Sequence, residues 1–195
     1  MSKLPNLPSS VSEELLETCI ESQQLYDGAV IRVYKDTVRL PNGKTGVREY
    51  NRHNGAVCVL PLTRDGHVLC VRQYRYACGC ELLEIPAGKL DSPDEPHEEA
   101  ARRELREETG AVNAKLTYLG KYLGSPAILN EVIYMYLAED FSMAETSLDE
   151  DEFLRTESIP LSELSAMVLR GEIPDGKTQA AVMRVQAMLA ERSKA

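Results

Sequence analysis

The chain has 195 residues, of which 43% are hydrophobic, and a formal net charge of −9 at pH 7. This length allows one domain, or at most two, with a real core. The negative charge argues against nucleic acid or an anionic membrane as a partner, because the overall field would repel both. No apolar run approaches the roughly 20 residues that are needed to span a bilayer.

The first eight residues lack the apolar core of a secretory signal. The five cysteines are an odd number, and three of them lie in apolar stretches. This favours buried free thiols in a reducing compartment over disulfides. Cys78 and Cys80 resemble a redox or soft-metal pair, but no second cysteine or histidine pair accompanies them. We therefore expect a cytoplasmic protein.

In chain order, the hydrophobic pattern predicts mixed α and β structure without repeats. Residues 11–20 form a short amphipathic segment that is compatible with a helix. Residues 29–40 alternate as a strand and turn at Pro41-Asn42-Gly43, a strong hairpin signal, into a strand at 45–51. Further strands are predicted at 56–62, 67–73, 81–85, 115–123, 131–137 and 153–157, and helices at 96–109, from about 162, and at 177–192.

The helix predicted over residues 96–109 carries an unusual acidic face. At about 100° per residue, Glu104, Glu107 and Glu108 share one side of it. Like charges at these spacings cost about 0.2–0.5 kcal/mol per pair, and the helical neighbours of Glu104 include no lysine or arginine. Such carboxylates are either a solvated acidic face or ligands of a hard divalent cation, which prefers oxygen.

The wider pattern favours the metal. Gly88, Glu95 and the run from Arg103 to Ala111, Arg-Glu-Leu-Arg-Glu-Glu-Thr-Gly-Ala, resemble the signature of the Nudix hydrolases. That signature reads Gly, five residues, Glu, seven residues, then Arg-Glu-aliphatic-x-Glu-Glu-x-Gly-aliphatic. Here six residues separate Gly88 from Glu95, and the extra one lies in a turn-like stretch, so the helix should remain intact. The resemblance implies an α/β/α sandwich with a mixed sheet.

Other stretches resemble the ADP-ribose pyrophosphatase branch of that family. Residues 71–76 (Val-Arg-Gln-Tyr-Arg-Tyr) precede 84–91 (Glu-Ile-Pro-Ala-Gly-Lys-Leu-Asp), a pairing typical of enzymes that act on nucleoside diphosphate sugars. Pro126 lies where that branch carries a proline beyond the acidic helix, and residues 175–178 (Asp-Gly-Lys-Thr) resemble the opening of its last helix. The resemblance implies substrate contacts from Arg72, Arg75, Glu84 and Pro126.

The resemblance also implies the domain organisation. Residues 1–52 resemble an N-terminal extension that builds a small antiparallel sheet and a dimer contact in related enzymes. We therefore predict a β extension and dimerisation element at 1–52 and a Nudix hydrolase domain at 53–195. A strand-rich extension exposes edges that a second subunit can cover, which agrees with a homodimer.

The metal site follows from the same comparison. We expect the ligands of Mg²⁺, or of Mn²⁺, to be Glu104, Glu107, Glu108 and the backbone carbonyl of Ala87. Such ions polarise phosphoryl oxygens and lower the pKa of a bound water. Arg103, four residues before Glu107, is expected to orient that carboxylate by a charge-assisted hydrogen bond. The alternative for Arg103 is an ordinary surface ion pair with Glu99.

The general base is expected in the acidic run Asp149-Glu150-Asp151-Glu152, with Glu150 as first choice and Glu152 as second. A solvated acidic loop is the alternative. Arg72 and Arg75 would point to opposite faces of an ideal strand, so only one can face the diphosphate unless the strand ends between them.

Together these features predict metal-dependent hydrolysis of the diphosphate bond of ADP-ribose, or a related nucleoside diphosphate sugar, to AMP and ribose 5-phosphate. One alternative is a GDP-mannose or UDP-sugar pyrophosphatase. Another is a non-catalytic Nudix module that senses a nucleotide, which the full glutamate set argues against. His53, His67 and His97 have no ligand spacing and no nucleophile partner, so zinc-enzyme and serine-hydrolase chemistry are poor interpretations.

Overall fold

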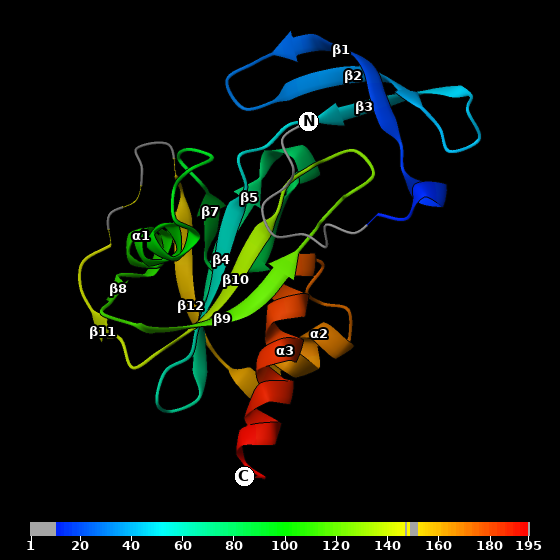
Figure 1. Ribbon diagram of the computed structural model, residues 1–195. Helices are drawn as coiled ribbons and strands as arrows, with labels where there is room; N and C mark the ends of the chain where they lie inside the picture. Colours follow the sequence, from blue (N-terminus) through cyan, green and yellow to red (C-terminus); the bar gives the residue numbers. More distant parts are fainter. Residues whose placement is uncertain (1–10, 147, 149–151, 195) are drawn as a thin grey trace. The chain divides into compact units, whose positions relative to one another are not determined.

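The computed structural model describes residues 11–146, 148 and 152–194. The chain forms two compact units (Figure 1). One consists of Met1–His53 with Leu123–Val132, and the other of Asn54–Tyr122 with Ile133–Ala195. The candidate base Glu150 lies outside the described residues, whereas Glu152 lies within them.

The smaller unit contains an antiparallel sheet in the order β1-β2-β3. Its strands are β1 (Thr18–Asp27), β2 (Arg32–Arg39) and β3 (Thr45–Asn51). The predicted hairpin is confirmed, since Gly43 has φ +80 and its N–H donates to the carbonyl of Leu40 at 2.9 Å.

Within residues 11–20 the expectation of a helix is wrong for most of the segment. Only the 3-10 turn η1 (Glu13–Leu15) is helical, and β1 begins at Thr18. Along one edge, β1 pairs with β2 from Thr18 to Asp27, and this tertiary context overrides the local amphipathic pattern.

The larger unit contains a mixed sheet in the order β7-β4-β10-β9. The strands are β4 (Ala56–Pro61), β7 (Ala87–Lys89), β9 (Lys115–Tyr122) and β10 (Ile133–Glu139). The β4–β10 pair is parallel, and the other two pairs are antiparallel. All six residues of β4 are buried, as expected for a central strand that is covered on both faces.

A second sheet has the order β12-β5-β6 and is antiparallel throughout. It consists of β5 (His67–Arg75), β6 (Cys80–Glu84) and β12 (Leu154–Pro160), and the 3-10 turn η2 (Tyr76–Cys78) joins β5 to β6. The short strands β8 (Ala111–Val112) and β11 (Ser142–Met143) pair with each other.

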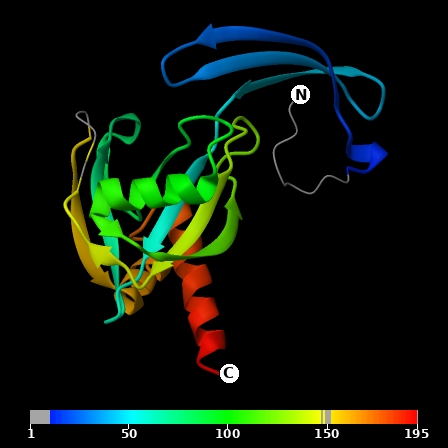
Figure 2. The same cartoon turned by 60° about the vertical axis from the view of Figure 1, so that its left-hand side comes forward.

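Three helices complete the larger unit: α1 (His97–Thr109), α2 (Leu161–Leu169) and α3 (Gly176–Arg192). Figures 1 and 2 show α1 on one face of the sheet that contains β4 and β10, and α3 on the other. This arrangement confirms the predicted α/β/α architecture with a mixed sheet. Among the helices of the described residues, none is long and apolar enough to cross a membrane.

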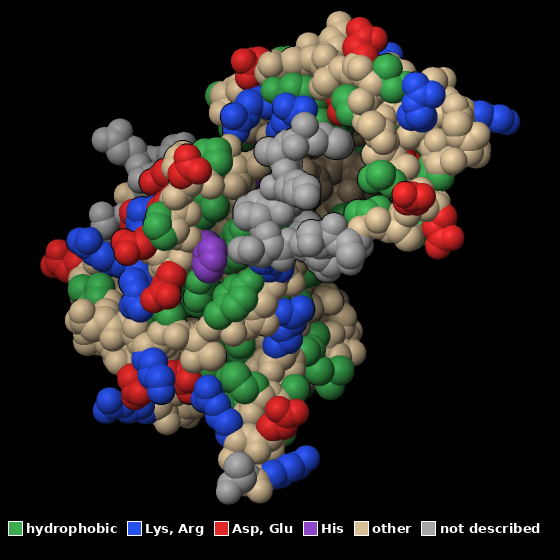
Figure 3. All heavy atoms as spheres, in the orientation of Figure 1, with side chains coloured by type: hydrophobic (Ala, Val, Ile, Leu, Met, Phe, Trp, Pro, Cys, Tyr) green, Lys and Arg blue, Asp and Glu red, His purple; other side chains and the backbone are tan. Residues whose placement is uncertain are grey.

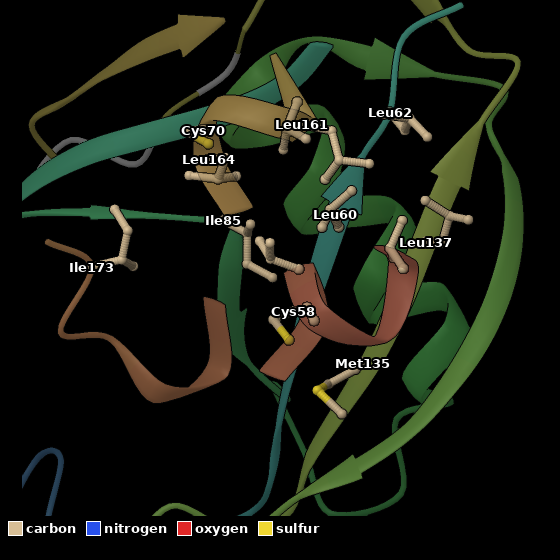
Figure 4. Close-up of a cluster of buried hydrophobic side chains, with 14 of the residues drawn as sticks. Cys58, Leu60, Leu62, Cys70, Ile85, Met135, Leu137, Leu161, Leu164 and Ile173 are labelled. Carbon is tan, nitrogen blue, oxygen red and sulfur yellow. The ribbon is translucent and has the colours of Figure 1, made fainter. Parts of the chain in front are cut away.

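The main core lies between the strands and the α2–α3 layer (Figure 4). Met135 and Leu137 of β10 and Cys58 of β4 are fully buried in it. Cys70 is buried too, and burial raises the pKa of both core thiols to about 12. Cys78 and Cys80 are exposed at the β5–β6 hairpin.

The opposite face of the sheet carries α1, which packs on β4 and β7. Ala100, Ala101 and Leu105 form the buried stripe of this helix, each at most 1% exposed. Small residues in this stripe bring the helix close to the strands. The same packing carries Glu104 and Glu108 to β7, where the site is built.

Candidate active site

The acidic helix α1 begins and ends where the sequence predicts, between a proline and a glycine. Pro96 is the N-cap of α1, and Gly110 ends it in the left-handed conformation with φ 75. The N–H of Gly110 donates to the carbonyl of Arg106 at 2.8 Å. A Cβ at this position would stand 2.4 Å from the carbonyl oxygen of Ala144, so glycine is needed for both conformation and space.

Two of the three candidate metal glutamates are buried together at β7. Glu104 is 7% exposed and Glu108 only 2%. The N–H of Ala87 donates to Oε2 of Glu108 at 3.0 Å. A Cβ on Gly88 would stand 2.0 Å from the carboxyl carbon of Glu104. Gly88 thus lies inside β7, and the absence of a side chain there makes room for a carboxylate.

Burial makes ionisation of this carboxyl pair costly. It raises the pKa of Glu104 to about 7, although the guanidinium of Arg103 lowers it. It raises the pKa of Glu108 to about 8, against the hydrogen bond from Ala87. The charge of Glu152 raises both values further. A bound cation would supply the missing compensation, so the donor chemistry fits a hard divalent ion.

These residues supply only part of a coordination shell. Among the described residues, no three histidine, cysteine or acidic side chains converge into a complete metal site. Glu107 is less buried than its two neighbours, with 30% of its side chain exposed. Because hard ions such as Mg²⁺ keep several waters, the remaining ligands would be water and phosphate oxygens.

Arg103 is the organising cation of the helix. It donates to Glu104 at 2.6 Å, to Glu107 at 3.2 Å and to the backbone carbonyl of Lys89 at 3.0 Å. It is therefore paired with the acidic face and not, among the ion pairs of the described residues, with Glu99. This geometry supports the predicted orienting contact to Glu107 and ties α1 to β7.

Glu95 joins the same network despite the extra residue in its loop. Its Oε1 lies 3.4 Å from Arg103, and its Oε2 accepts the N–H of Asp91 at 2.6 Å. The turn therefore absorbs the insertion and leaves the carboxylate within reach of the helix.

The two candidate substrate arginines of β5 diverge as the strand geometry predicts. Arg75 lies on the side of the carboxyl pair: it hydrogen-bonds Glu84, and its charge lowers the pKa of Glu108. Arg72 instead forms a two-pronged ion pair with Glu157 of β12, at 2.6 and 3.1 Å.

Two further candidates are Glu152, whose charge acts on both Glu104 and Glu108, and Pro126. Glu152 lines a cavity of about 440 Å³ together with Arg72, Tyr74 and Phe153. Pro126 belongs to the smaller unit.

The start of α3 also contacts this region, although from the sequence we expected residues 175–178 only to open the last helix and named no site residue there. Asp175 caps the helix, accepting the N–H of Thr178 at 2.9 Å. Lys177 lies 3.4 Å from Glu84 and 3.0 Å from Asp175. An aspartate directly before a helix is a recognisable cap signal, but the contact with Glu84 is not visible in the sequence.

Comparisons with known proteins identify the family of the chain. The family model for the NUDIX domain matches residues 52–181, and that for the nucleoside diphosphate sugar hydrolase N-terminal domain matches residues 17–51. The ADP-ribose pyrophosphatase of Bacillus subtilis (strain 168) is 40% identical over 176 residues, which is 89% of this chain and 95% of that protein. A methanol dehydrogenase activator of Bacillus methanolicus is 37% identical over 91% of this chain and 97% of its own length.

Among solved structures, an ADP compounds hydrolase superposes with a TM-score of 0.82, covering 94% of this chain and 100% of that one. At 24% identity this likeness supports the fold alone. The family models together span most of the chain, and the glutamate helix lies inside the first of them. The chain therefore belongs to the Nudix family, as a hydrolase that carries the N-terminal domain of the nucleoside diphosphate sugar hydrolases.

Proposed function

We propose that this chain hydrolyses the diphosphate bond of ADP-ribose to AMP and ribose 5-phosphate with Mg²⁺, or Mn²⁺, as cofactor. The observation that carries the proposal is the buried pair Glu104 and Glu108, held against β7 by Ala87 and Gly88. Two buried carboxylates without a cation between them are costly, whereas a divalent ion and an anionic diphosphate turn the same arrangement into a binding site.

Each residue has a distinct part in the proposed reaction. Glu104 and Glu108 would hold the divalent ions, with Glu107 and the carbonyl of Ala87 as further ligands. When bound, such ions neutralise phosphoryl oxygens and make a water acidic enough to ionise near neutral pH. Arg103 fixes the orientation of Glu104 and Glu107 through its hydrogen bonds.

Two arginines and a proline are proposed on the substrate side. Arg75 offers a guanidinium to the diphosphate, since it lies on the side of Glu108 and is 38% exposed. Arg72 is already held by Glu157, so any contact with substrate would come at the cost of that pair. Pro126 remains a candidate from the smaller unit.

The base that takes the proton of the attacking water is proposed to come from residues 149–152. Glu152 is supported by its electrostatic effect on both Glu104 and Glu108, which requires that it lie near them. Glu150 stays a candidate from the sequence alone. A base must come within hydrogen-bond reach of the proton that it takes, and the charge of Glu152 acts on both carboxyls of the pair.

We also propose that the protein is a cytoplasmic homodimer that forms through the smaller unit. β1 is an edge strand, and Ile20, Leu25 and Tyr26 on it are 49%, 48% and 57% exposed. An open edge with apolar side chains is a place for pairing with a second chain.

The substrate is tested by incubating the purified protein and Mg²⁺ with ADP-ribose, GDP-mannose and UDP-glucose in parallel. The proposal predicts the highest kcat/KM for ADP-ribose, with AMP as a product. Faster turnover of GDP-mannose would move the chain to the alternative substrate. Tight binding of ADP-ribose without any turnover would identify a nucleotide sensor.

A further inference from the structure

We infer that Glu84, Lys177 and Asp175 are positioning residues that hold Arg75 in place for the substrate diphosphate, so that the start of α3 sets the geometry of the active centre. The inference rests on the proposed function for the identity of the substrate. Its basis is a chain of direct contacts within the larger unit.

Glu84 is the centre of this chain. Its side chain is only 4% exposed. Oε2 accepts from Nε of Arg75 at 3.2 Å and from Nη2 of the same guanidinium, and it lies 3.4 Å from Nζ of Lys177. Arg75 of β5 and Lys177 of α3 therefore share one buried carboxylate. Because Glu84 is almost fully buried, we infer that it acts on a ligand through a neighbouring cation and not by direct contact.

Lys177 is in turn fixed from the other side. Its ammonium lies 3.0 Å from Asp175, and the side chains of Lys177 and Asp175 are 11% and 15% exposed. Asp175 also accepts the hydroxyl of Thr178 at 2.5 Å, and that hydroxyl oxygen accepts the N–H of Ile85 at 3.0 Å. The start of α3 is thus bound to the residue that follows Glu84.

The charges of the four groups balance, since Arg75 and Lys177 oppose Glu84 and Asp175. Arg75, at 38%, is by far the most exposed of them. The other three can hold its guanidinium without themselves reaching an anionic ligand. Burying these ionic groups costs free energy of desolvation. We infer that the network offsets this cost in function, because it fixes the orientation of Arg75 beside Glu108.

This gives Glu84 a different part from a direct substrate contact. Its role in binding, expected from the sequence, would be exerted through Arg75. Lys177 has the same indirect role. It lies in the first turn of α3, between the carboxylates of Glu84 and Asp175, and is only 11% exposed.

The test is a double-substitution cycle between Glu84→Gln and Arg75→Met, with ADP-ribose hydrolysis and Mg²⁺ as the assay. Charged hydrogen bonds of this kind predict a rise in KM of about 10- to 100-fold for each single variant, with a smaller effect on kcat. In the Arg75→Met background, Glu84→Gln should add no more than about twofold, because both act through the same guanidinium.

Two further variants separate positioning from folding. Asp175→Asn keeps an N-cap acceptor but removes the charge next to Lys177, and it should raise KM with little change in the unfolding transition in urea. Lys177→Arg should retain more activity than Lys177→Met. Glu139→Gln is the matched control, because it breaks another glutamate–arginine pair, with Arg192 at the far end of α3, and should leave KM unchanged.

Calorimetric binding of inorganic pyrophosphate with Mg²⁺ gives a reading that does not depend on ADP-ribose being the substrate. Weaker binding in both single variants, and no further loss in the double variant, would support the inference even if ADP-ribose were not hydrolysed. Independent, additive effects of Glu84→Gln and Arg75→Met, or no binding change in either, would overturn it. Failure of the wild-type protein to hydrolyse ADP-ribose would count against the proposed function alone.

Discussion

Gly88 is a residue whose lack of a side chain positions a candidate metal ligand. It lies in β7, and a Cβ there would occupy the space of the Glu104 carboxylate. The obstructed group is the end of a flexible side chain, so an added methyl would displace the carboxylate and leave the backbone in place. The signature shared with other Nudix chains identifies this glycine, but only the packing of α1 on β7 shows that its function is close approach.

We predict that Gly88→Ala lowers kcat/KM for ADP-ribose by about 100-fold, since a displacement of about 1 Å at a catalytic group has effects of this size. The free energy of unfolding in urea should change little. Gly171→Ala is the contrasting control: φ is +75 there with open space around it, so stability should fall by about 1 kcal/mol with unchanged kcat/KM. Full activity of Gly88→Ala would show that the position of Glu104 is not critical.

At the level of the elements, α1 was predictable because its signals agree. Proline before the helix, glycine after it and a stripe of small and apolar residues all mark the segment that the structure confirms as His97–Thr109. β1 gave no such signal, because nearly all of its positions are exposed and no alternation results. β7 has only three residues, which is too short for periodicity.

Some contacts of the candidate site follow from local sequence spacing, and others do not. The pairing of Glu104 with Glu108 follows from helical spacing, and the divergence of Arg72 from Arg75 follows from strand geometry. The contact between Glu84 and Lys177 joins β6 to α3 across a long stretch of sequence. It depends on how the second sheet and the last helix pack, which no local pattern encodes.

The cap of α3 allows a prediction about this element by itself. Replacing Asp175 by alanine removes the acceptor of the Thr178 N–H and should lower the free energy of unfolding by about 1 kcal/mol. Asp175→Asn should lower the free energy of unfolding by only a few tenths of a kcal/mol, because asparagine is also a good N-cap residue. Urea unfolding followed by circular dichroism measures both variants. Equal losses for alanine and asparagine would mean that charge, and not capping, dominates at this helix end.

For the whole molecule, the net charge of −9 repels an anionic substrate, so binding of a diphosphate requires local positive charge. Figure 3 shows acidic and basic side chains interspersed over the visible face. An anionic diphosphate therefore needs specific positive groups, for which bound metal ions and Arg75 are the proposed source. The smaller unit has a different proposed role, as the contact between subunits.

We predict that Ile20→Glu together with Leu25→Glu converts a dimer into a monomer, because charges would replace two half-exposed apolar side chains on the edge strand. Light scattering coupled to size exclusion measures the mass directly. The matched control is Leu169→Glu, at the end of α2, where the side chain is 76% exposed in the larger unit. A wild-type protein that is already monomeric at micromolar concentration would contradict the proposed assembly.

The central claim, that buried Glu104 and Glu108 hold divalent ions for diphosphate hydrolysis, is tested most directly by one comparison. It is the rate of AMP formation from ADP-ribose by the wild-type protein and by Glu108→Gln, each with Mg²⁺ and with excess chelator. We predict turnover by the wild-type protein only with Mg²⁺, and a kcat at least about 100-fold lower for Glu108→Gln with an unchanged fold. Undiminished activity in excess chelator, or an equal kcat for the variant, would contradict the claim.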